Sequence, residues 1–205
     1  KTNFSFDMLT GAGEIEYTNY FLTDEFDEKA DSAVAGFKIL PSSFDWNYSM
    51  DGGGKLKDNI AYRGSTNSDG GHILAGADGY YTITLNTANN TATMVKYEGN
   101  VTNYGTIQIA GSFNEWADTP MLPYNTEGVE NHAWYYVMEV PAGDPIQFKF
   151  KIAGSWDTSW GYGAEDGAIN MYGKCDAGGK NIGLAEGKYV ISFNDITGAF
   201  SIVKL

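Results

Sequence analysis

The feature that most constrains the fold is a segment that occurs twice. Residues 81–96, YTITLNTANNTATMVK, align without gaps on residues 189–204, YVISFNDITGAFSIVK, and five of the sixteen positions are identical. In each copy, apolar and polar residues alternate on both sides of a polar turn, which predicts a β-hairpin. The shift from residue 81 to residue 189, 108 positions, predicts two consecutive domains of the same build, each closed by such a hairpin.

Further landmarks repeat in the same order. Phe37-Lys38-Ile39 resembles Phe150-Lys151-Ile152, and an aromatic loop follows each of them. A Gly-Gly pair then precedes an isoleucine in both halves, Ile73 and Ile182. Four landmarks in one order indicate a tandem duplication rather than chance.

The boundary between the halves lies in the polar segment from Gly99 to Tyr104. We therefore expect a first domain over residues 1–99 and a second over residues 104–205. The content of 15% aromatic residues and 26 glycines is typical of strands joined by turns, and no window predicts a capped amphipathic helix. The predicted fold class is all-β, with two tandem Ig-like antiparallel β-sandwich domains.

Three strands are predicted in the second domain. Residues 107–110 open it, and residues 134–140 alternate between a face with Trp134 and a face with Tyr135. Residues 147–152 place Phe148 and two other apolar side chains on one face and polar side chains on the other. This alternation is typical of antiparallel sheets with one buried face, and it assigns Trp134 to the core.

Composition excludes several classes of function. A net charge of −13, from 26 acidic and 13 basic residues, would repel a phosphate backbone, so nucleic acid is not an expected partner. The single cysteine, Cys175, cannot form an intrachain disulfide, and we interpret it as a structural residue. The acidic run at residues 24–31 is interpreted as a solvated loop, so no catalytic residue, metal or cofactor is predicted.

The start of the chain indicates an exported protein that continues beyond this sequence. No apolar run is long enough to span a membrane as a helix, and the first residues do not form a signal peptide. Because the sequence begins without Met and leads almost directly into a predicted strand, we expect that an export signal or lipid anchor precedes it.

Three tryptophans lie in predicted loops of the second domain, at positions 116, 156 and 160. Their neighbours are Gly, Ser, Asn, Asp and Thr, which are turn residues. An exposed indole can cover the apolar C–H face of a sugar ring while nearby polar groups bind its hydroxyls. Trp116, Trp156 and Trp160 are therefore candidate glycan-binding residues; the alternative is that they seal one end of a sandwich.

Polar partners for sugar hydroxyls are expected near these loops. Lys149 and Lys151 fit by strand parity, because they alternate with the apolar face of their strand. Further candidates are Asn181, Lys180 and Lys174, which lie in or beside loops. For each lysine, a simple solvated position is the alternative.

Four motifs in order resemble a known family. They are residues 107–116 (IQIAGSFNEW), 148–156 (FKFKIAGSW), 178–182 (GGKNI) and 187–193 (GKYVISF). Together they resemble the starch-binding modules of the SusE/SusF family, surface lipoproteins of Bacteroidetes starch-utilisation systems. The first half of the chain resembles the family more weakly.

The resemblance implies a non-catalytic protein that binds an α-glucan, a polysaccharide or oligosaccharide of starch type. It also implies a lipid anchor to the outer membrane at the cell surface, and a glycan transporter complex as a partner. On this sequence the first platform aromatic would be Trp116 and the second Trp156 or Trp160, with Lys149 or Lys151 and Asn181 as polar partners.

The first domain departs from the family pattern. If Phe4-Ser5-Phe6 is aligned with Ile107-Gln108-Ile109, Gly13 stands at the position of Trp116. Phe44, Trp46 and Tyr48 are candidates for a reduced site there. Two other functions stay open: accessory binding domains of a secreted glycoside hydrolase, and an adhesion or assembly module that binds another protein.

Overall fold

The structure is a computed structural model, and it describes residues 14–21, 54–55, 61–63, 73–74, 79–86, 91–124 and 131–205. Regular structure in these residues consists of β-strands and one 3-10 turn, so the prediction of an all-β chain is confirmed. No helix among them has the length and apolar character needed to cross a membrane. The chain divides into two compact units, with the main division between Asn100 and Val101.

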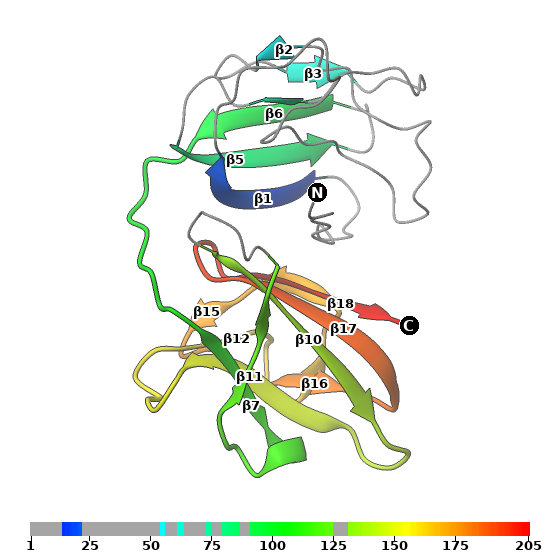
Figure 1. Ribbon diagram of the computed structural model, residues 1–205. Coiled ribbons are helices and arrows are strands. Elements are labelled where there is room, and N and C mark those ends of the chain that lie inside the picture. Colours follow the sequence, from blue (N-terminus) through cyan, green and yellow to red (C-terminus); the bar gives the residue numbers. More distant parts are fainter. Residues whose placement is uncertain are drawn as a thin grey trace, which may run out of the picture. The chain divides into compact units, whose positions relative to one another are not determined.

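The first unit contains a sheet with the strand order β1-β5-β6-β3 and a separate parallel pair, β2 and β4 (Figure 1). The described core side chains of this unit include Tyr81, Ile83 and Met94, each at most 4% exposed. The strands are β1 (Glu14–Phe21), β2 (Gly54–Lys55), β3 (Ala61–Arg63), β4 (Ile73–Leu74), β5 (Gly79–Asn86) and β6 (Thr91–Lys96).

The second unit contains two sheets. One has five strands in the order β14-β18-β17-β10-β9; we call it the hairpin sheet. The other has seven strands, with β11 paired to β7 on one edge and to β16 and β12 on the other; we call it the site sheet. Strands of the hairpin sheet are β9 (Leu122–Pro123), β10 (Ala133–Val140), β14 (Tyr172–Lys174), β17 (Gly187–Asn194) and β18 (Ala199–Lys204). Strands of the site sheet are β7 (Ile107–Gly111), β8 (Thr119–Pro120), β11 (Ile146–Ile152), β12 (Ser159–Gly161), β13 (Ala168–Ile169), β15 (Asp176–Ala177) and β16 (Ile182–Leu184), and the 3-10 turn η2 (Ser112–Asn114) follows β7.

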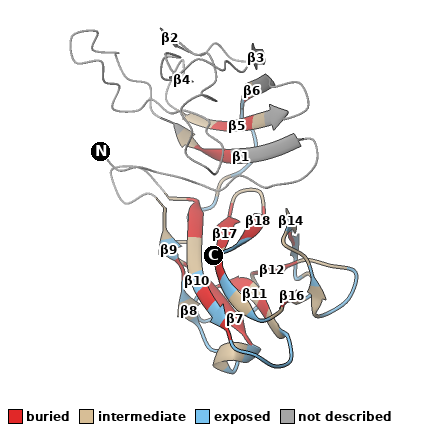
Figure 2. Ribbon diagram, turned by 90° about the vertical axis from the view of Figure 1, so that its right-hand side faces the viewer, coloured by how far each residue is buried: buried red, intermediate tan, exposed pale blue. Residues whose placement is uncertain are grey.

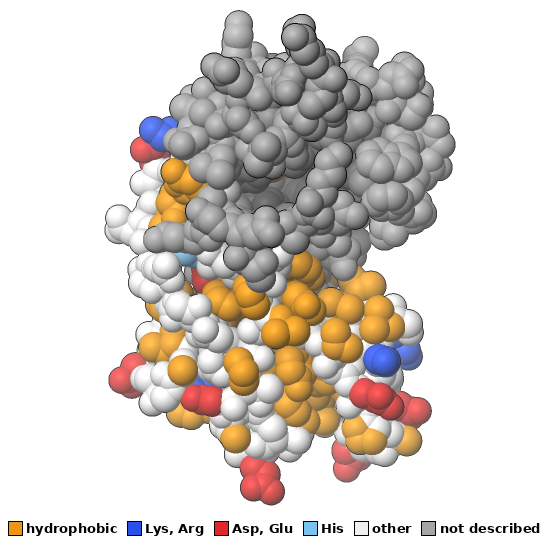
Figure 3. Space-filling model, viewed as in Figure 1, with side chains coloured by type: hydrophobic (Ala, Val, Ile, Leu, Met, Phe, Trp, Pro, Cys, Tyr) orange, Lys and Arg blue, Asp and Glu red, His pale blue; other side chains and the backbone are white. Residues whose placement is uncertain are grey.

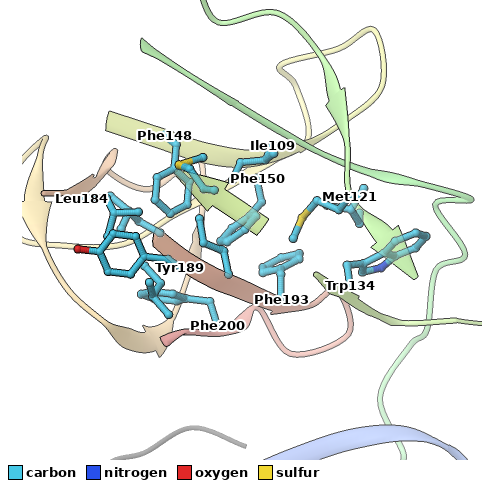
Figure 4. Close-up of a cluster of buried hydrophobic side chains, with 14 of the residues drawn as sticks. Ile109, Met121, Trp134, Phe148, Phe150, Leu184, Tyr189, Phe193 and Phe200 are labelled. Carbon is cyan, nitrogen blue, oxygen red and sulfur yellow. The ribbon is translucent and has the colours of Figure 1, made fainter. Parts of the chain in front are cut away.

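The core of the second unit lies between these two sheets. Aromatic side chains from both layers meet in it, and the rings of Phe150 and Phe193 stack with centroids 4.2 Å apart and planes 16° apart (Figure 4). The buried residues follow the central strands of both sheets, whereas the connecting loops are exposed (Figure 2). The unit is therefore a two-layer β-sandwich held by apolar burial.

Over the predicted segments of β10 and β11, strand parity follows the sequence pattern with one exception. In β10, Trp134 is 3% exposed and lies in the core, as predicted, whereas Val137 on the opposite parity is 46% exposed. In β11, Phe148 and Phe150 are fully buried. The exception is Lys151, which is on the outer face of the site sheet but only 2% exposed, because other side chains cover it.

The two copies of the repeat form hairpins with the same register, so both hairpin predictions are confirmed. Tyr81 pairs with Lys96 in the first unit, and Tyr189 pairs with Lys204 in the second. The burial also corresponds, since Ile83 and Ile191 are both in a core. The repeat therefore describes one structural element used twice.

The correspondence extends beyond the hairpin. The order β1-β5-β6-β3 in the first unit matches β10-β17-β18-β14 in the second, and the antiparallel pairs have equivalent registers. The parallel pair of β2 with β4 likewise matches the parallel pair of β13 with β16. The sequence did not predict this strand order.

Candidate functional site

The first loop of the candidate site runs from β7 to β8 and carries Trp116. Asn114 organises it: its Oδ1 accepts the Gly111 N–H at 2.9 Å, and its Nδ2 donates to the Ala117 carbonyl at 2.7 Å. Glu115 and Trp116 have positive φ angles of 55° and 62°, which turn the backbone sharply. The loop thus presents Trp116 at the edge of the site sheet.

The second loop joins β11 to β12 and carries Trp156. It turns at Gly154, whose φ of +71° favours glycine, and it closes where the Ile152 N–H donates to the Thr158 carbonyl at 3.2 Å. Trp156 is 46% exposed, although tryptophan is usually well buried.

The two loops bring the indoles of Trp116 and Trp156 together. Their ring centroids are 6.0 Å apart and the ring planes are inclined at 60°. Trp116 is partly exposed. We call these two residues the tryptophan pair.

A buried charge lies next to Trp156. The ammonium group of Lys151 is 4.9 Å from the centroid of the Trp156 ring and forms an ion pair with Asp118. The other carboxylate oxygen of Asp118 accepts the Gly154 N–H at 2.6 Å. The pKa of Asp118 lies below its ordinary value, first because of the hydrogen bond from Lys151 and then because of the one from Gly154.

A row of hydrogen-bonded polar groups begins at the base of the first loop. The Ser112 hydroxyl accepts the Gln147 N–H at 3.0 Å, and the Gln147 side chain accepts from Asn181 Nδ2 at 3.0 Å. The Asn181 N–H donates to Asp166 at 2.8 Å, and Lys180 lies 3.6 Å from the same carboxylate. We call these five residues the polar row.

Lys149 is half-buried on the same outer face of β11 as Gln147 and Lys151. Desolvation lowers the pKa of Lys149, and the neighbouring Asp166 partly offsets this effect. Asp166 itself has a lowered pKa, first because it accepts the Asn181 N–H. The site sheet thus carries one cation with reduced hydration next to the polar row.

Exposure alone does not identify this site. Hydrophobic side chains are visible on the surface of the second unit (Figure 3), and Tyr172 in the hairpin sheet is as exposed as Trp156, at 46%. Trp156 differs because a second indole and the buried ammonium group of Lys151 lie next to it.

Two of the predicted site residues are not part of this arrangement. Trp160 is in the core at 9% exposure, with its ring 5.4 Å from Phe193 and 5.3 Å from Tyr104. Trp160 lies in β12, where it pairs with Phe150 of β11, and this pairing turns the indole inward. Lys174 lies at the end of β14 in the hairpin sheet, two residues before β15 of the site sheet, and its role in binding stays a prediction. The burial of Trp160 corrects its assignment, and Trp160 takes the sealing role given above as the alternative.

Lys151 also differs from its prediction. It was expected to offer its ammonium group to sugar hydroxyls, but Asp118 and Trp156 enclose that group. The sequence analysis missed Asp118 and Gln147. Asp118 had a detectable signal, since it is an acidic residue two positions after Trp116. Phe44, Trp46, Tyr48 and Gly13 lie outside the described residues.

Two groups that could carry chemistry, the Cys175 thiol and the His132 imidazole, are buried in the second unit. Burial raises the pKa of the Cys175 thiol, which therefore stays protonated. His132 is fully buried and its Nδ1 lies 2.7 Å from Asp195, whose second oxygen accepts the Trp134 indole N–H at 2.8 Å. Within the described ranges, no three His, Cys, Asp or Glu residues form a group that could hold a metal ion.

Asp195 gives the stability a pH dependence of defined sign. Burial raises its pKa above the ordinary 3.8, so the folded state binds a proton more readily than the unfolded state. Its contribution to the free energy of unfolding therefore falls as the pH rises from 3.8 through the raised pKa. Urea unfolding of wild type and Asp195→Asn at several pH values measures this difference. A wild-type advantage that grows with pH would contradict it.

Glu115 is strained in the first loop. Its positive φ of 55° is unfavourable for a side chain with a Cβ, whereas glycine adopts it freely. Glu115→Gly is expected to raise the free energy of unfolding by up to about 1 kcal/mol. Glu139→Gly, an exposed position within β10, is the control and should lower it by about 1 kcal/mol. Thermal unfolding measures both, and a clear loss for Glu115→Gly would show that the side chain itself stabilises the loop.

Comparisons with known proteins add a distant structural likeness. No protein-family model matches the chain, and no curated protein matches it. Among solved structures, the chain is similar to SusF from Bacteroides thetaiotaomicron, with 17% sequence identity and a TM-score of 0.38. The match covers 94% of this chain and 42% of that chain, so this chain spans less than half the length of SusF.

Proposed function

We propose that the chain is a non-catalytic glycan-binding protein and that its second unit holds a polysaccharide on the tryptophan pair. The observation that carries this proposal is the indole of Trp156, which is 46% exposed and lies next to a second indole. It also lies over the ammonium group of Lys151, whose charge is balanced by Asp118. An exposed indole that lies beside a second indole forms an apolar patch, and such a patch supports a ligand surface.

The chemistry of the pair suits a sugar. The C–H face of a pyranose ring is apolar and packs on an indole, while the hydroxyl groups at its rim need donors and acceptors. Lys149 and Asn181 supply such groups on the same face of the site sheet. The division between an apolar surface and a polar border is that of a carbohydrate site.

The inclination of the two indoles favours a curved chain. A flat β-1,4-linked ribbon presents its sugar faces nearly in one plane, whereas the ring planes of Trp116 and Trp156 are inclined at 60°. An α-1,4-glucan turns between successive rings and can contact both indoles. The family resemblance of the sequence points the same way, so the substrate class is a starch-type α-glucan.

The proposal also covers the domain arrangement and the location of the protein. The matching strand orders of the two units support two tandem Ig-like sandwiches. In this arrangement the first domain is a spacer or a weaker binding module. The resemblance to SusE/SusF proteins supports display at the cell surface through a lipid anchor, beside a glycan transporter complex.

The test is affinity electrophoresis of the purified chain in gels containing amylose, pullulan, dextran, xylan or β-glucan. Retardation by amylose and pullulan alone is the expected result. Equal migration in every gel would overturn glycan binding, and retardation only by xylan or β-glucan would overturn the α-glucan assignment. Release of reducing sugar from amylose by the same preparation would show that the chain is an enzyme.

A further inference from the structure

Asp118 connects both loops of the tryptophan pair through one carboxylate. One oxygen pairs with the Lys151 ammonium group, and the other accepts the Gly154 N–H at 2.6 Å. Asp118 lies two residues after Trp116, and Gly154 lies two residues before Trp156. The carboxylate therefore fixes the distance between the backbones that carry the two indoles.

The charge of Lys151 makes this connection sensitive. Its side chain is 2% exposed, with Trp156 over the ammonium group, so water has little access to the charge. An enclosed ammonium group without a counter-ion costs free energy in the folded state. If Asp118 loses its charge, that cost is reduced when water reaches the ammonium group. Because the Trp156 ring centroid lies 4.9 Å from the ammonium group, water admitted to that group competes with the indole for the space next to it.

The left-handed turn at Gly154 completes the arrangement. Its φ of +71° belongs to the region that favours glycine, and a Cβ at this position would meet no atom within 4 Å. Glycine is therefore required here by the direction of the backbone and not by lack of space. That direction aims the N–H at Asp118.

From these contacts we infer that Asp118 is a positioning residue, which holds the tryptophan pair in its inclined geometry before any glycan is bound. This inference rests on the proposed function for its role in binding, but the geometry of the free protein tests it separately. A site held in its binding geometry loses less conformational freedom on binding, which increases affinity.

The test uses the exciton coupling of the two indoles in circular dichroism, obtained as the difference between wild type and Trp156→Phe. The same difference is taken in the Asp118→Asn background, with and without Trp156→Phe. Without glycan, this signal is expected to be weaker than in the wild type, and the affinity for amylose is expected to fall about tenfold. Asp118→Asn combined with Lys151→Met removes both charges, so the signal and most of the affinity should return. Asp166→Asn is the matched control for the signal, because Asp166 also pairs with a lysine and accepts a backbone N–H.

An unchanged exciton signal and affinity in Asp118→Asn, even with reduced thermal stability, would overturn the inference. If that variant does not fold, Asp118→Glu keeps the charge but displaces Gly154, and an unchanged signal there would overturn it equally. A weakened signal in a protein whose wild type binds no glycan would support the positioning role while refuting the proposed function.

Discussion

Replacing Trp156 with alanine is expected to reduce the affinity for amylose by at least about 30-fold, which corresponds to about 2 kcal/mol for the loss of a central aromatic contact. The change removes one of the two ring faces and uncovers the ammonium group of Lys151. Because the indole is 46% exposed, the thermal midpoint should change little.

Tyr172→Ala is the matched control for this experiment. Tyr172 has the same 46% exposure but lies in the hairpin sheet. Affinity electrophoresis in amylose should therefore leave its binding unchanged. Equal losses in both variants would indicate nonspecific aromatic contacts, and a large fall in thermal midpoint for Trp156→Ala would assign the indole to the fold.

Phe150→Ala is expected to lower the free energy of unfolding of the second unit by about 4 kcal/mol. Phe150 is fully buried and its ring stacks on Phe193 at 4.2 Å, so truncation leaves a cavity between the two sheets. Neighbouring rings from both layers limit how far the core can collapse into that cavity.

Urea unfolding followed by tryptophan fluorescence measures this loss. Of the five tryptophans, only Trp46 precedes residue 101, so the signal reports mainly the second unit. Val137→Ala, at an outward position of β10 with 46% exposure, is the control and should cost less than about 1 kcal/mol. A loss below about 1 kcal/mol for Phe150→Ala would show that the two sheets are not tightly packed there.

Local pattern was sufficient for the strands and insufficient for the site. Alternation along β10 and β11 predicted which apolar side chains enter the core, since strand parity is set by neighbouring residues. The burial of Lys151 could not be predicted in this way, because it depends on Asp118 and Trp156, which approach from two other loops.

The two tryptophans of the second loop illustrate the same limit. Trp156 and Trp160 are four residues apart and have similar neighbours in sequence. Their burial differs because β12 pairs with β11. This pairing places Trp160 opposite Phe150, so its indole points into the core. A pairing partner outside the local segment is not encoded in loop composition.

Two hairpins of equal register in one chain can compete for each other's places while the protein folds. The sequences differ where such an exchange would matter: Phe193 pairs with Phe200 in the second hairpin, and Leu85 pairs with Ala92 at the matching positions of the first. Exchanged hairpins would leave a void where two fully buried phenylalanines belong. Divergence between the repeats thus discourages misassembly, because the first hairpin lacks the two phenylalanines that fill the core of the second unit.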